Sequence, residues 1–185
     1  MKEFNWTPGI GDPTPIGWLT VALYLVTAVV CWRIARRLRD PGAATGSEAP
    51  VWAAIAILFL ALGINKQLDL QSALTEIGRV LAHAQGWYDR RGYVQLVFVI
   101  AVGVVCIFAA MVFLFLIRRA PAVTWLAALG TILVLAFVAI RAASFHHFDE
   151  FIGTTVLGLR WNWVLEIGGI LIVLVAGWLR NKSQI

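Results

Sequence analysis

The sequence predicts an all-helical membrane protein, built as one domain with a bundle of five transmembrane helices. Two observations predict this class. Of the 185 residues, 61% are hydrophobic and 14% are charged, whereas soluble domains are about 45–50% apolar and about 25% charged. In addition, five apolar segments reach or approach the length of about 20 residues that a helix needs to cross a bilayer. A soluble enzyme and a disordered chain are both excluded.

The five spans are expected at about residues 16–38, 51–70, 93–117, 121–141 and 161–179. The first follows a polar N-terminus that lacks the apolar core of a signal peptide. A loop rich in Pro, Gly and Ser precedes the second, and Pro121 suits the first turn of the fourth. Tryptophans near the span ends are typical of an interfacial belt: Trp18, Trp52, Trp87, Trp125, Trp161, Trp163 and Trp178.

Basic residues predict the orientation of these spans. They follow the first span, separate the third from the fourth, and follow the fifth. With five spans, these three segments lie on one side, which the positive-inside rule makes cytoplasmic. We expect an integral protein of the plasma (bacterial inner) membrane with its N-terminus extracytoplasmic and its C-terminus cytoplasmic. Nucleic acid is not an expected partner, since no basic surface is interleaved with aromatic residues that could stack on bases.

Two outer segments, 71–92 and 142–160, are then extracytoplasmic. No proline interrupts the chain from Val51 to Tyr93, so the second span is expected to continue as an amphipathic helix. Gly86 is expected to end it. This helix could lie on the outer membrane surface or pack on the other spans, cover an outward-facing cavity, or contact a partner. The second segment is expected to form a short helix or a re-entrant turn.

Four charges from different segments are expected at one membrane depth: Lys66 and Arg141 against Asp69 and Glu166. An isolated charge inside a bilayer costs about 2.5–3.5 kcal/mol, so the charges should pair. We expect Glu166 to face Arg141, with Lys66 as the second choice. The cluster could be an ion-pair network that fixes packing, or a polar cavity that binds a solute or a lipid headgroup.

The binding-cluster candidates share the extracytoplasmic side and a polar or charged side chain. They are Asn65, Lys66, Asp69, Glu76, Arg79, His83, Arg141, His146, His147, Asp149, Glu150, Asn162 and Glu166. A metal site built from His83, His146, Asp149 and Glu150 is the less favoured alternative, because the sequence has no His-Glu-x-x-His element. No cofactor is indicated.

The stretch from Asp12 to Trp32 contains prolines, a Gly-Trp pair at Gly17 and Trp18, Tyr24 six residues later and a closing Trp. With five predicted spans and nine tryptophans, it resembles the tryptophan-rich sensory (translocator) proteins. That resemblance implies binding of porphyrins or steroids, and no binding residue is carried over from it.

The sequence therefore predicts a ligand- or lipid-binding, sensing or accessory membrane subunit. The alternative is a membrane-embedded enzyme, such as a metal-dependent hydrolase or transferase, that acts on lipid-linked substrates at the outer leaflet. The expected partners are the lipid bilayer, a small apolar or lipid-like ligand and other membrane proteins.

Overall fold

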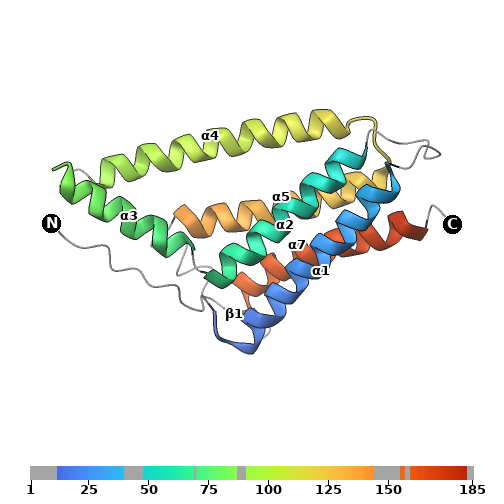
Figure 1. Ribbon diagram of the computed structural model, residues 1–185, viewed down its shortest axis with the longest axis horizontal. Helices are drawn as coiled ribbons and strands as arrows, with labels where there is room; N and C mark the ends of the chain where they lie inside the picture. Colours follow the sequence, from blue (N-terminus) through green and yellow to red (C-terminus); the bar gives the residue numbers. More distant parts are fainter. Residues whose placement is uncertain are drawn as a thin grey trace.

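The computed structural model describes residues 12–39, 48–68, 70–86, 91–143, 155–156 and 159–182, with only the backbone described in parts of the later helices. The described chain is almost entirely helical, which confirms the all-helical part of the predicted class (Figure 1). Three stretches are long and apolar enough to cross a membrane: Pro15–Arg37, Ala49–Leu68 and Ala122–Ala139. Part of a fourth helix, Gly103–Phe115, is apolar but shorter.

Helices occupy all five segments that the sequence predicted as spans. They are α1 (Pro15–Arg37), α2 (Ala49–Leu68), α4 (Arg91–Ile117), α5 (Ala122–Ala143) and α7 (Trp161–Lys182). The side chain of Thr14 caps α1 by accepting a hydrogen bond from the Gly17 amide at 3.1 Å, and Pro15 occupies the first turn. Pro121 directly precedes α5, as its fixed φ favours.

The helices pack in the order α2, α1, α7, α5, with α4 touching α5. Successive long helices run in opposite directions, so the start of α1 and the end of α7 lie at opposite ends of the bundle (Figure 1). The core between them combines large and small side chains, among them Tyr24, Trp52, Phe59, Ala127 and Ala176. Trp52 is fully buried there, so its ring packs against the core rather than on the exterior of the bundle.

Two glycines allow α5 and α7 to approach closely. A Cβ on Gly130 would lie 2.8 Å from the Gly169 carbonyl oxygen, and one on Gly169 would lie 2.7 Å from Val134 Cγ2. Such contacts are typical of membrane helices, which associate through close packing rather than through the hydrophobic effect.

The amphipathic segment is a separate helix, α3 (Leu70–Ala84), which corrects the expected continuous extension of the second span. It leaves the direction of α2 and runs away from the bundle (Figure 1). The physical reason is that α2 is apolar on all sides and suits the bilayer interior, whereas α3 has one apolar side and suits the interface. Gly86, with φ of 73°, follows its end as predicted.

In the second outer segment, the described residues form a small antiparallel pair, β1 (Thr155–Val156) with β2 (Leu159–Arg160), directly before α7. Residues 142–143 of this segment still belong to α5, and the expected short helix is not seen in the two strands. The remainder, 144–154 and 157–158, lies outside the described residues.

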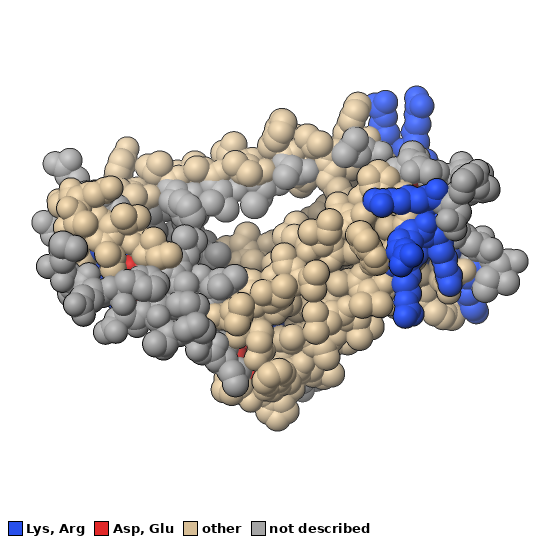
Figure 2. Space-filling model, in the orientation of Figure 1, with Lys and Arg blue, Asp and Glu red and all other residues tan. Residues whose placement is uncertain are grey.

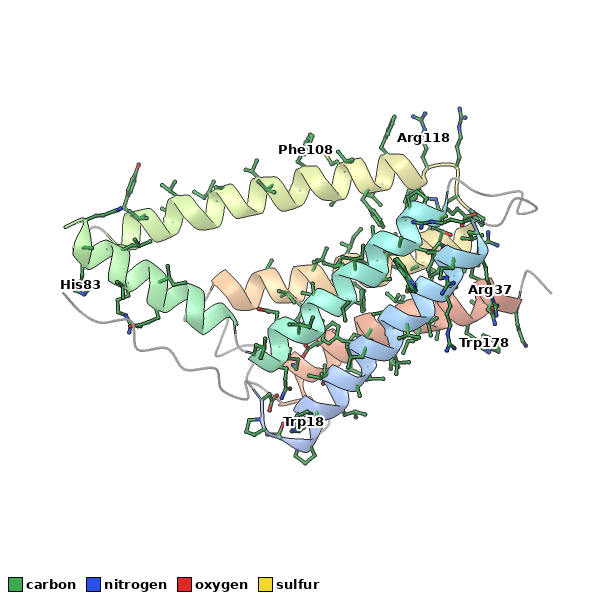
Figure 3. The ribbon with its side chains drawn as sticks, in the orientation of Figure 1. Trp18, Arg37, His83, Phe108, Arg118 and Trp178 are labelled. Carbon is green, nitrogen blue, oxygen red and sulfur yellow. The ribbon has the colours of Figure 1, made fainter. Side chains whose placement is uncertain are left out.

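Exposed cations gather at one end of the bundle, called here the basic end (Figure 2). They come from the C-terminus of α1, the turn between α4 and α5, and the C-terminus of α7: Arg33, Arg36, Arg37, Arg39, Arg118, Arg119 and Lys182. The three basic segments thus share one side, as the sequence predicted. Figure 3 shows Arg37, Arg118 and Trp178 at this end and Trp18 at the other.

Candidate functional site

A buried ion pair joins α2 to α7 at the end of the bundle opposite the basic end. Lys66 Nζ donates to both oxygens of Glu166, at 3.0 Å to Oε1 and 2.8 Å to Oε2. The Lys66 side chain is 13% exposed and that of Glu166 is 4% exposed. Glu166 lies five residues into α7, about 8 Å along the helix axis from its start.

Tyr24 brings α1 into the same site. Its hydroxyl donates to Glu166 Oε1 at 3.1 Å, and its ring packs at a tilt against Phe59 of α2, with centroids 5.7 Å apart. Tyr24 is 1% exposed. Three helices therefore meet at one carboxylate, and we call Tyr24, Lys66 and Glu166 the Glu166 cluster.

In the Glu166 cluster, the hydrogen-bonding capacity of the carboxylate is used more fully than that of the ammonium. The carboxylate accepts three hydrogen bonds, whereas the ammonium has three N–H groups and donates to that single partner among the described residues. Lys66 is also the most exposed member. Among the described residues, two hydrogen bonds to one carboxylate leave the third N–H of the ammonium without a described acceptor.

The sequence preferred Arg141 as the partner of Glu166, with Lys66 as the second choice, and the structure shows the pair with Lys66. Arg141 lies in α5 and Asn162 in α7, but their side chains are outside the described residues. Also outside are four candidates of the second outer segment and one between α2 and α3: His146, His147, Asp149, Glu150 and Asp69. The predicted four-charge cluster is thus described only for Lys66 and Glu166.

The other candidates whose side chains are described are Asn65 on α2 and Glu76, Arg79 and His83 on α3. Asn65 is half-buried next to Lys66 on α2. On α3, Arg79 donates to Glu76 Oε2 at 2.8 Å, a pair one turn apart with the Arg79 side chain 49% exposed. His83 is exposed near the end of α3, far from the start of α1 marked by Trp18 (Figure 3).

The metal alternative gains no support from the described residues, where no three His, Cys, Asp or Glu side chains are grouped to hold an ion. Of the four residues suggested for a metal, His83 is described and is exposed. The other three fall in the outer segment that the structure does not describe.

A second buried ion pair, which the sequence analysis missed, lies at the basic end. Arg180 Nη2 of α7 donates to Glu48 Oε1 at 2.9 Å, and the hydroxyl of Thr124 in α5 donates to Glu48 Oε2. Glu48 directly precedes α2 and is 2% exposed. The sequence feature that could have identified Glu48 is its position. It is an acidic residue between the arginine-rich end of α1 and the apolar helix α2. We call Glu48, Thr124 and Arg180 the Glu48 cluster.

The two clusters resemble each other in chemistry, and both are largely buried. Both hold a carboxylate against a cation and a hydroxyl from three elements. The cation side chain is 8% exposed in the Glu48 cluster and 13% exposed in the Glu166 cluster.

Comparison with protein-family models, curated proteins and solved structures found no match to this chain. The likeness of the first span to the tryptophan-rich sensory proteins therefore receives no support from these comparisons.

Proposed function

We propose that the chain is a plasma-membrane protein that spans the bilayer five times, with its N-terminus outside and its C-terminus inside. Three helices meet the length and hydropathy of a span. Helices α4 and α7 have 27 and 22 residues and run along the bundle in the directions that alternating spans require (Figure 1). Gathering of cations at one end supports a cytoplasmic assignment of that end.

The exterior of the bundle supports membrane embedding. Large apolar side chains are exposed on every long helix, for example Val29 at 51%, Ile57 at 61% and Val175 at 50%. A soluble monomer rarely exposes an apolar patch of more than a few hundred Å². A lipid environment makes this exposure favourable.

Within that frame, we propose a ligand-binding, sensing or accessory subunit whose ligand is a lipid or another apolar molecule with a polar head. The observation that carries this proposal is the Glu166 cluster, an ion pair set inside apolar helices at the end that would face the outer leaflet. Ionisable residues within membrane helices are costly and often mark functional sites. The partly exposed Lys66 can donate to an oxygen of the headgroup while the tail lies along the apolar exterior.

Retained lipid after purification tests this function, and the Glu48 cluster provides a matched control. The test variant is Lys66→Met with Glu166→Leu, and the control is Glu48→Leu with Arg180→Met. Each removes one buried ion pair and no net charge. Mass spectrometry of organic extracts should find a stoichiometric lipid or apolar ligand with the native chain and the control, and a reduced amount with the test variant.

Circular dichroism and gel filtration would show which variants are folded before the extracts are compared. A native chain that retains no stoichiometric ligand would contradict the proposal. So would equal retention by a folded test variant, since the Glu166 cluster would then serve packing alone. If the test variant fails to fold, Lys66→Arg keeps the charge pair and should retain the ligand with altered affinity; unchanged affinity would also count against the site.

A further inference from the structure

The basic end carries a charge excess that the described part of the protein does not neutralise. Seven cations are exposed there, on three separate chain segments. The carboxylate described at this end, Glu48, is 2% exposed and already accepts from Arg180 and Thr124. The exposed arginines therefore face outward without a described acidic counterpart, and an external anion would complement them.

Aromatic contacts place some of these cations at the border between the apolar exterior and water. The Arg118 guanidinium lies 4.0 Å from the centre of the Phe115 ring, and Lys182 Nζ lies 4.4 Å from the centre of the Trp178 ring. Phe115 is 61% exposed and Trp178 is 57% exposed. Exposed aromatic side chains at helix ends are typical of the headgroup region. The cations beside them would lie at the level of lipid phosphates.

We infer that the basic end binds anionic phospholipid headgroups in preference to zwitterionic ones. Each phosphate accepts charge-assisted hydrogen bonds from the arginine guanidinium groups, which present planar pairs of donors. A zwitterionic headgroup brings its own cation, which the surrounding arginines repel. Lipid preference is a separate property from the orientation of the protein in the membrane. It requires that the folded basic end distinguishes one lipid headgroup from another after insertion.

Arg36, Arg39 and Arg119 are suitable test positions. All three are exposed, and they come from two segments of the basic end. Their replacement leaves intact the Arg37–Asn181 hydrogen bond and the two aromatic contacts of Arg118 and Lys182. A basic residue near an anionic membrane surface contributes about 1 kcal/mol, or about fivefold in affinity. The triple change Arg36→Gln, Arg39→Gln and Arg119→Gln should therefore weaken anionic-lipid binding by roughly a hundredfold.

The measurement is a titration of the full chain in nonionic detergent with short-chain phosphatidylglycerol and, separately, phosphatidylcholine, so that insertion does not depend on the variant. The native chain should bind phosphatidylglycerol more tightly, and added salt should reduce the difference. Arg79→Gln, an exposed change on α3, is the matched control and should keep the preference. Equal affinity of the native chain for both lipids would overturn the inference, as would a folded triple variant that keeps the preference.

If the triple variant does not fold, the single change Arg119→Gln replaces it. The same titration should then show about a fivefold loss with phosphatidylglycerol and no change with phosphatidylcholine. An unchanged phosphatidylglycerol affinity would overturn the inference. Weakening of both lipids to the same extent would also overturn it, because the site would then not distinguish headgroup charge.

Discussion

Glu166 is the residue on which its cluster depends, because every hydrogen bond described there ends on its carboxylate. Glu166→Ala would leave the Lys66 ammonium buried without its counter-charge. Breaking a buried pair in this way costs about 3–5 kcal/mol. Lys66→Met combined with Glu166→Leu removes both charges with little loss of volume, so we expect much of that stability to return.

The measurement is a double-mutant cycle of unfolding free energies in mixed detergent micelles. Lys66→Met alone, Glu166→Leu alone and the double variant should show strong coupling between the two positions. If the loss of unfolding free energy in the double variant equals the sum of the two single losses, the ammonium and the carboxylate do not interact.

The Tyr24 hydroxyl makes a separate, smaller contribution to the free energy of unfolding. Tyr24→Phe keeps the ring against Phe59 and removes the hydrogen bond to Glu166 Oε1. We expect a loss between about 0.6 kcal/mol, the average for polar contacts between membrane helices, and about 3 kcal/mol, the upper range for a charged acceptor. Thermal unfolding would measure it. Tyr93→Phe, on an exposed side chain of α4, should change nothing, and equal effects of the two would contradict this account.

At this scale the sequence predicted that Glu166 must be paired, with Arg141 as the first choice and Lys66, which the structure shows, as the second. Arg141 was preferred because a guanidinium matches a carboxylate in shape, whereas the partner depends on which helices are neighbours. That neighbourhood follows from packing, which no spacing in the sequence determines. Glu48 was missed for the same reason, because its partner Arg180 lies 132 positions away.

At the scale of elements, α2 and α7 carry charges in the same arrangement. Each has a carboxylate toward its N-terminus and a cation toward its C-terminus: Glu48 and Lys66 for α2, Glu166 and Arg180 for α7. The two cations lie in the last turns of their helices, where they complement the helix dipole. Because the two helices are antiparallel, each carboxylate meets the other helix's cation, which gives one ion pair at either end. A parallel arrangement would place like charges together, so the pattern favours this topology.

The contact between α5 and α7 gives a prediction with an internal control. Gly169→Ala would force a Cβ to within 2.7 Å of Val134 and 3.1 Å of the Gly130 carbonyl oxygen, so the helices must separate. Gly168, its neighbour on α7, has nothing within 4 Å of such a Cβ. Alanine there should be neutral or stabilise by up to about 1 kcal/mol through helix propensity.

Thermal unfolding of the two single variants in detergent would check this, with Gly169→Ala expected to melt at the lower temperature. If the two variants unfold at the same temperature, the close approach of α5 and α7 does not contribute to stability.

The sequence predicted the elements well where the hydrophobic pattern is long and uniform, as in α1, α4 and α7. It failed at the junction of α2 and α3, where the absence of proline suggested one continuous helix. The change from an all-round apolar pattern to a one-sided pattern between Leu68 and Leu70 was the better signal. A helix that crosses the bilayer and a helix that lies along it cannot share an axis.

At the scale of the whole molecule, the fold class and the separation of charge followed directly from composition and from the positions of Lys and Arg. The described basic segments meet at one end although they are far apart in the sequence. This follows from the alternating directions of the long helices. The identity of a ligand does not follow in the same way, because it depends on a few side chains whose neighbours are set by packing.

The orientation of the bundle gives the last prediction, which uses single cysteines in a background where Cys31 and Cys106 are replaced by Ala. Gln85→Cys lies just after α3, at the end of the molecule away from the exposed cations. Ala44→Cys lies in the sequence between α1 and α2, after the arginines of the basic end. With the basic end in the cytoplasm, a membrane-impermeant maleimide added to intact cells should label position 85, while position 44 should react only after the membrane is permeabilised. The reverse result would invert the molecule. It would place the Glu166 cluster at the cytoplasmic side, and the expected ligand would then come from the inner leaflet.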